Sequence, residues 1–128
     1  MPLARIALPK GKSVQYREAL TDGLQQALVE TFNVPQDDQF MLLTEHAPAD
    51  FVYNRHYLGI ERSDDFIVIQ LTVSDTRTVA QKQALYRRIV ELLAERPGVR
   101  QEDVFINLVE VRPENWSFGF GEAQYVKT

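Results

Sequence analysis

A chain of 128 residues with 45% hydrophobic content is long enough to bury one sizeable core and too short for two independent cores. Its 14 Lys and Arg against 18 Asp and Glu give a net charge of -4, which argues against a nucleic-acid or membrane partner. The sequence contains no cysteine and two histidines, so neither a disulfide nor a metal site is expected. Without a spanning apolar run or a signal peptide, we expect a cytoplasmic protein.

The first half of the chain has the pattern of a strand, a helix and a second strand. Residues 3–8 alternate apolar with small or charged residues, which indicates a strand. Apolar residues then recur at three- and four-residue steps from Ser13, a plausible helix N-cap, and predict a helix that ends before Pro35. Residues 40–43 predict a short second strand, and residues 51–60 an irregular hairpin.

The second half repeats this order of elements. Residues 66–73 form a nearly continuous apolar and β-branched run, as expected for a central strand that is covered on both faces. Thr78 followed by Gln81 is the pattern of a capping box and predicts the start of a second helix, which ends at Pro97. Residues 104–111 predict a last strand.

The two halves match each other at an offset of 65 residues. Residues 12–14 (Lys-Ser-Val) align with residues 77–79 (Arg-Thr-Val), and residues 34–38 align with residues 99–103. Each half therefore forms a β-α-β unit, in which a right-handed crossover makes the two strands parallel. Two such units related by a pseudo-two-fold axis predict an α+β fold, a four-stranded sheet with both helices on one face.

We expect residues 1–128 to form a single domain. It would consist of pseudo-repeats at about 2–64 and 65–111, followed by an aromatic tail at 112–128. The sheet face opposite the helices is left uncovered in a monomer, so we expect a homo-oligomer that buries it.

Pro2 is the first candidate for chemistry. Removal of Met1 before this small residue leaves a secondary amine directly ahead of the first strand. An α-amino group has a pKa of about 7.7 to 8.0, and modest burial or a nearby cation brings that pKa into the range of a general base. A nearby carboxylate has the opposite effect. Proline after methionine is common, so this residue alone does not define a site.

Arg77 lies between the central strand and the second helix, where helix N–H groups and a guanidinium together suit a carboxylate ligand. The pseudo-two-fold axis places this end of strand 66–73 beside the start of strand 3–8. Arg77 and Pro2 are therefore expected to be neighbours. The alternative interpretation of Arg77 is a solvated arginine at a helix start.

Asp38 lies in the turn before the second strand, and its repeat counterpart Asp103 is expected to be an ordinary turn residue. This favours a capping role for Asp38. The functional alternative is a carboxylate that orients water or raises the pKa of the proline. In the tail, Trp116, Phe118 and Tyr125 lie among glycines that do not resemble a phosphate-binding loop. These aromatic residues either form an apolar wall over the proline or pack against another subunit.

Pro2, the duplicated β-α-β unit, Arg77 and the aromatic tail together resemble the tautomerase superfamily (4-oxalocrotonate tautomerase-like) over nearly the whole chain. Four motifs look most like the malonate semialdehyde decarboxylase group: Val34-Pro35-x-x-Asp38, Thr44-Glu45-His46, Arg77-Thr78-x-x-Gln81-Lys82 and Trp116-Ser-Phe118-Gly119-x-Gly121. The resemblance implies a homotrimer without metal or organic cofactor. It also implies that the amino-terminal proline acts as a base in tautomerases and as an acid in decarboxylases and hydratases.

Carried over to this chain, the resemblance makes Pro2 the catalytic amine, Arg77 the ligand of the substrate carboxylate, and Asp38 the counterpart of the decarboxylase's acidic residue. The residues that match the apolar wall of the decarboxylase are Trp116, Phe118 and Tyr125. One departure concerns a second arginine, which the decarboxylase has two residues before the equivalent of Arg77. This chain has Asp75 there.

The favoured hypothesis is a cofactor-independent keto-enol tautomerase that acts on 2-oxo acids of the phenylpyruvate type, with Pro2 as general base and Arg77 on the carboxylate. The alternative is an enzyme like malonate semialdehyde decarboxylase or hydratase, with cationic Pro2 as general acid and Asp38 assisting. Asp75 argues against this alternative because the site loses a cation and gains an anion. A non-enzymatic trimeric binding module is the third hypothesis.

Overall fold

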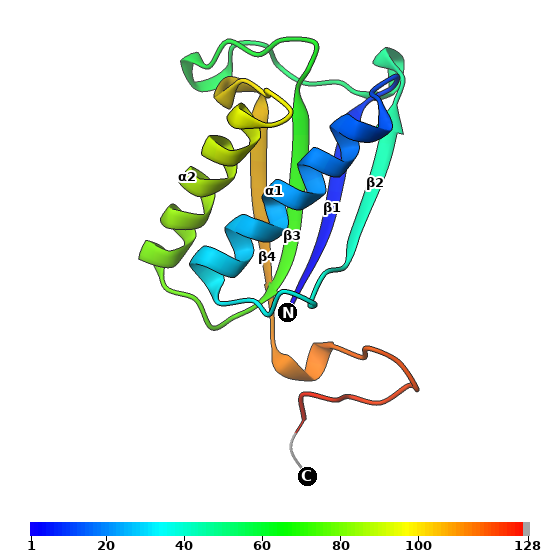
Figure 1. Ribbon diagram of the computed structural model, residues 1–128, viewed down its shortest axis with the longest axis vertical. Helices are drawn as coiled ribbons and strands as arrows, with labels where there is room; N and C mark the ends of the chain where they lie inside the picture. Colours follow the sequence, from blue (N-terminus) through cyan, green and yellow to red (C-terminus); the bar gives the residue numbers. More distant parts are fainter. Residues whose placement is uncertain (127–128) are drawn as a thin grey trace.

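The computed structural model describes residues 1–126, which form a four-stranded mixed sheet with two helices on one face (Figure 1). The strands are β1 (Pro2–Pro9), β2 (Met41–His46), β3 (Ile67–Ser74) and β4 (Val104–Val111). The helices are α1 (Val14–Phe32), between β1 and β2, and α2 (Val79–Glu95), between β3 and β4. Within the described residues, neither helix is long and apolar enough to cross a membrane.

The strand order β2-β1-β3-β4 confirms the predicted α+β architecture. β1 and β2 are parallel, β3 and β4 are parallel, and the two central strands β1 and β3 are antiparallel. Pro2 is paired with Val73, so the beginning of β1 lies beside the end of β3. The loop that leads from β3 into α2 therefore starts next to the amino terminus.

Both helices begin where the sequence predicts. The hydroxyl of Ser13 accepts a hydrogen bond from the backbone N–H of Tyr16 at 3.1 Å, which caps α1. Thr78 and Gln81 form the reciprocal bonds of a capping box at the start of α2. The helices pack their apolar sides on the sheet, where the core contains these fully buried large side chains: Ile6, Leu8, Leu20, Leu24, Leu28, Ile67, Ile69, Leu71, Leu85, Ile89 and Leu93.

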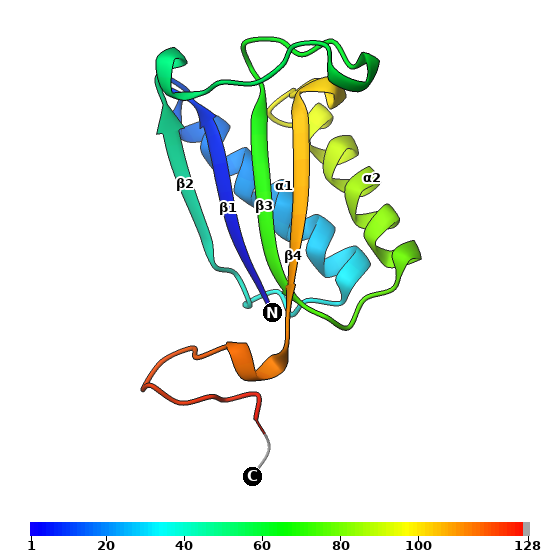
Figure 2. The same cartoon turned by 180° about the vertical axis from the view of Figure 1, so that it is seen from behind.

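Among residues 1–126, no helix lies on the opposite face of the sheet (Figure 2). In β4 the residues that pack on the core alternate with outward-facing residues, among them Phe105 and Val109, which are exposed. Leu42 of β2 is exposed in the same way. The sheet thus presents apolar side chains on its uncovered face.

Two local expectations differ from the structure. The second strand is longer than residues 40–43 because β2 pairs with β1 along its length, from Met41 opposite Ala4 to His46 opposite Pro9. The hairpin expected at residues 51–60 is wrong, since this described segment contains no strand. It ends instead in a 3-10 turn, in which Leu58 has a φ of 61°.

Candidate active site

The amino terminus lies at the end of the sheet where β3 leads toward α2 (Figure 1). The structure retains Met1, so the Met1 amine stands in for the amine that Pro2 would carry after Met1 is removed. Pro2 itself is buried. Burial lowers the pKa of the terminal amine; Asp38 raises this pKa and Arg77 lowers it further. A carboxylate and a guanidinium therefore both act on the amine.

Asp38 directs its carboxylate at the amine from the loop before β2. Its Oδ2 lies 3.9 Å from the terminal nitrogen. Its Oδ1 is buried and has no hydrogen-bond partner within residues 1–126. Burial raises the pKa of Asp38, the amine lowers it, Asp37 raises it and Arg77 lowers it. Asp38 thus has one oxygen near the amine and another with capacity to accept a proton or a hydrogen bond.

Arg77 is held in place by the end of α1. Its Nη2 donates to the carbonyl oxygen of Phe32 at 2.9 Å, and its guanidinium carbon lies 4.9 Å from the centroid of the Phe32 ring. Its Nη1 donates to the hydroxyl of Thr76 at 3.1 Å. These two bonds occupy two of the five N–H donors of a guanidinium. Arg77 is therefore a fixed cation at the start of α2, beside the amine.

The aromatic tail reaches the same end of the sheet. Trp116 Nε1 donates to the hydroxyl of Ser74, the last residue of β3, at 3.3 Å. The ring of Phe118 stacks on Trp116 with centroids 5.5 Å apart, and Tyr125 meets Phe118 edge-on at 4.7 Å. Burial raises the pKa of the Tyr125 phenol, Asp38 raises it further and Arg77 lowers it. The tail therefore lies within the electrostatic reach of Asp38 and Arg77.

The structure thus brings the predicted site residues together at one end of the sheet. They are Pro2, Asp38, Arg77, Trp116, Phe118 and Tyr125. Asp75 lies close by in the loop after β3 and is exposed; its backbone N–H donates to Val111 at the end of β4.

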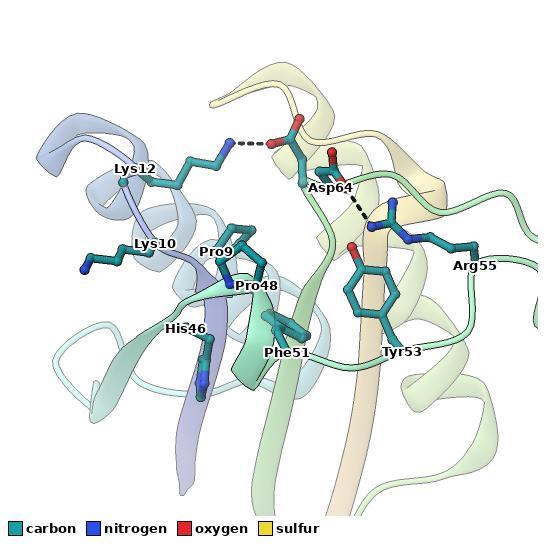
Figure 3. Close-up of a pocket in the computed structure, with 11 residues that line it drawn as sticks. Pro9, Lys10, Lys12, His46, Pro48, Phe51, Tyr53, Arg55 and Asp64 are labelled. Atoms are coloured by element: carbon teal, nitrogen blue, oxygen red, sulfur yellow. Dashed lines mark hydrogen bonds and ion pairs between the residues drawn. The ribbon is translucent and has the colours of Figure 1, made fainter.

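A cavity of about 490 Å³ lies at the opposite end of the sheet (Figure 3). Its lining residues Lys12, Phe51 and Tyr53 precede Arg77, Trp116 and Phe118 by the 65-residue offset of the repeat. The 3-10 turns Pro48–Asp50 and Pro113–Asn115 are separated by the same offset. The cavity is therefore the pseudo-symmetric counterpart of the amine end.

This cavity lacks the central group of the candidate site, the terminal amine. The residue that begins β3 as Pro2 begins β1 is Ile67, which is internal to the chain and has no titratable amine. Lys12 is paired with Asp65, and Arg55 is paired with Asp64 at 2.6 Å (Figure 3). The lining includes the imidazole of His46, whose Nε2 lies 3.0 Å from the hydroxyl of Thr44, but it includes no α-amino group. We therefore place the candidate active site at the other end, where the terminal amine, Asp38 and Arg77 come together.

Two buried polar residues that hold the loops before β2 and β4 are not indicated by the sequence patterns. Asp103, expected to be an ordinary turn residue, is fully buried and accepts hydrogen bonds from the backbone N–H and hydroxyl of Ser63 at 2.7 and 2.6 Å. Gln25, in the middle of α1, is also buried and donates to the loop that carries Asp38. The sequence feature that could have identified Gln25 is an amide side chain on the apolar face of the predicted helix.

A duplicated β-α-β sheet with an amine, a carboxylate and a guanidinium at the start of its first strand is the arrangement expected of an acid-base enzyme that uses its amino terminus. A family model described as tautomerase enzyme matches residues 38–119, and another with the same description matches residues 2–60. The chain belongs to the tautomerase family, and it is an enzyme of that family.

The known proteins that this chain resembles span almost its whole length. Probable tautomerase YusQ of Bacillus subtilis (strain 168) is 40% identical over 127 residues, which cover 99% of this chain and 100% of YusQ. The crystal structure of FG41 malonate semialdehyde decarboxylase inhibited by 3-bromopropiolate is 41% identical, with a TM-score of 0.90 and coverage of 96% and 93%. A fused 4-OT symmetric trimer shares the fold at 21% identity and a TM-score of 0.77, covering 94% of each chain.

Proposed function

We propose that this protein is a keto-enol tautomerase of 2-oxo acids of the phenylpyruvate type, with the Pro2 amine as general base after Met1 is removed. The observation that carries the proposal is the convergence of the terminal amine, Asp38 and Arg77 beside the start of β1. Arg77 binds the substrate carboxylate through its free guanidinium edge. Neutral Pro2 then moves a proton between the enol oxygen and the carbon next to the carbonyl: in ketonisation it takes the proton from the oxygen and delivers it to that carbon, and enolisation is the reverse.

The electrostatics of the amine support the role of a base. Burial and Arg77 both lower the pKa of the terminal amine, and only Asp38 among the three named causes opposes them. A lowered pKa increases the neutral fraction of the amine at pH 7, and the neutral form is the one that accepts a proton. The aromatic cluster of Trp116, Phe118 and Tyr125 supports an aryl group on the substrate.

A second candidate function is decarboxylation or hydration in the manner of malonate semialdehyde decarboxylase. The 41% identity and the TM-score of 0.90 to a protein of that name favour it. Asp38 would raise the pKa of Pro2 and so retain the proton that a general acid needs. Asp75 weighs against it, because an anion stands where the resemblance calls for a second arginine.

We further propose that the chain forms a homotrimer in the cytoplasm. The uncovered face of the sheet presents Leu42, Phe105 and Val109, which a subunit interface would remove from water. Native mass spectrometry should give three times the monomer mass of 14.7 kDa. A monomer at micromolar concentration would contradict the trimer without affecting the assignment of the amine.

The proposed activity is tested with the enol form of phenylpyruvate, whose ultraviolet absorbance is lost on conversion to the keto form. Intact mass first establishes that Met1 is absent. We expect the protein to accelerate ketonisation and Pro2→Ala to lower kcat/KM by about 100-fold or more. Equal rates for the two proteins would contradict the role of Pro2. Release of CO2 from malonate semialdehyde at a higher kcat/KM than ketonisation would favour the second candidate.

A further inference from the structure

The two repeat-related loops before β2 and β4 have the same backbone turn. The N–H of Asp38 donates to the carbonyl of Pro35 at 3.0 Å, and the N–H of Asp103 donates to the carbonyl of Arg100 at 2.9 Å. Asp103 follows Asp38 by the 65-residue offset of the repeat. The two carboxylates therefore start from equivalent positions, and any difference between them arises from their surroundings.

In the second unit, the aspartate itself holds the loop. Both oxygens of Asp103 accept hydrogen bonds from Ser63, which precedes β3, and Arg100 Nη1 lies 3.6 Å from Oδ2. Asp103 is fully buried. Its carboxylate is therefore committed to fastening the loop to the segment before β3.

In the first unit, a residue of α1 holds the loop instead. Gln25 Nε2 lies within hydrogen-bond distance of three loop carbonyls, those of Pro35 at 3.4 Å, Gln36 at 3.3 Å and Asp38 at 3.0 Å. The corresponding position of α2 is Val90, which has no polar side chain. The first unit thus anchors its loop from a helix side chain, whereas the second unit anchors its loop through the aspartate itself.

Burying Gln25 at this position lowers the stability of the folded state. It is 2% exposed on the helix face that packs in the core, and its Oε1 is buried without a hydrogen-bond partner among residues 1–126. A buried amide oxygen without a partner destabilises the folded state relative to an apolar side chain such as that of Val90. A residue that costs stability in one unit and is replaced by an apolar residue in the other indicates a functional constraint.

We infer that Gln25 is a positioning residue: it fixes the loop before β2 through its main chain, and so leaves the Asp38 carboxylate free to face the terminal amine. The Asp38 carboxylate oxygen then lies 3.9 Å from the terminal nitrogen, whereas the Asp103 carboxylate is hydrogen-bonded to Ser63. This inference rests on the proposed function, in which the Pro2 amine and Asp38 work together.

The test is the pKa of the Pro2 amine, measured by 15N NMR in four forms: the unaltered protein, Gln25→Met, Asp38→Asn and the double variant. Methionine retains the length of Gln25 and removes its donors. The charged or titratable groups that act on the amine or lie with it are Asp38, Asp37, Arg77 and Tyr125. A carboxylate raises the pKa of a neighbouring amine, so Asp38→Asn should lower it by about one unit.

Gln25→Met should lower the pKa of the amine by about half as much, because a loosened loop weakens the contact with Asp38. In the Asp38→Asn background the same change should have no further effect, since the charge it positions is gone. Asp103→Asn is the matched control, because it loosens the equivalent loop at the far end of the sheet and should leave the amine unchanged.

The outcomes separate this inference from the proposed function. If Asp38→Asn lowers the pKa and Gln25→Met lowers thermal stability without shifting the pKa, Gln25 is merely structural and the inference is wrong. An equal shift for Gln25→Met with and without Asp38 would overturn it too. If Asp38→Asn leaves the pKa of the amine unchanged, Asp38 does not act on the amine and the inference about Gln25 is wrong. Ketonisation that depends on Pro2 would still support the proposed function.

Discussion

Trp116 donates its indole N–H to the hydroxyl of Ser74 at 3.3 Å and so ties the aromatic tail to the residue that ends β3. Ser74 is buried, and the preceding residue Val73 is paired with Pro2. One hydrogen bond therefore connects the tail to the strand end beside the amine. This bond holds the tail at the same end of the sheet as the candidate site, and the rings of Trp116 and Phe118 stack on each other within the tail.

We expect Trp116→Ala to raise KM for phenylpyruvate by up to about tenfold, because an aromatic pair contributes roughly 0.5–1.5 kcal/mol beyond its buried area. The change in melting temperature should be small, since the tail lies outside the core. Phe120→Ala is the control: Phe120 belongs to the same tail but is 97% exposed. Equal KM values for the two variants would show that the tail does not contact the substrate.

Arg77→Ala should raise KM by about tenfold or more, since removal of one partner of a charge-assisted bidentate contact costs at least 1.4 kcal/mol, equivalent to tenfold. Because Arg77 also bonds to Phe32, the variant should unfold at a lower temperature. Lys12→Ala is the matched control, as Lys12 occupies the equivalent position in the first unit. A similar rise in KM for Lys12→Ala would point to the cavity at the other end instead.

Asp38→Asn should make the protein more stable at pH 7. Burial raises the pKa of Asp38, which means that folding disfavours its charged form. At a pH where Asp38 is ionised, the residue therefore lowers the free energy of unfolding. This loss is fully present above the raised folded-state pKa and disappears as the pH falls below the ordinary value of 3.8. Urea unfolding between pH 4 and pH 8 checks the sign; a variant that is less stable than the unaltered protein at pH 7 would contradict it.

Asp103→Asn should behave in the opposite way. The buried carboxylate accepts two short bonds from Ser63, and hydrogen bonds to charged groups contribute about 1.5–3 kcal/mol. We expect a lower free energy of unfolding and an unchanged kcat. Urea unfolding and the ketonisation assay on one preparation check both; a fall in kcat without a loss of stability would assign Asp103 a part in catalysis.

Most of the fold was predictable because each repeat contains local sequence patterns that mark its helices and strands. Ser13 and Thr78 mark the helix starts, and the 65-residue offset between them fixes the order and direction of the strands. The segment 51–60 was not predictable in the same way. Its Phe51 and Tyr53 have the residue types of a strand, but they pack on Phe66 rather than across a strand pair.

The candidate site was predictable where the residue types carry their own chemistry. Pro2 and Arg77 stood out for this reason, and the antiparallel pairing of β1 with β3 places both at one end of the sheet. Gln25 and the different surroundings of Asp38 and Asp103 were not predictable, because they depend on contacts between segments distant in sequence. Ser63 and Asp103 lie 40 residues apart.

The central claim, that neutral Pro2 acts as a base, is tested most directly by the pKa of the Pro2 amine in the unaltered protein, titrated by 15N NMR after intact mass has established the loss of Met1. Burial and Arg77 outweigh Asp38 in this account, so the pKa should lie below 8.0, the ordinary value of an α-amino group. A pKa near 9 would contradict the account, because Pro2 would then be a cation at neutral pH, suited to the decarboxylase or hydratase reaction as a general acid.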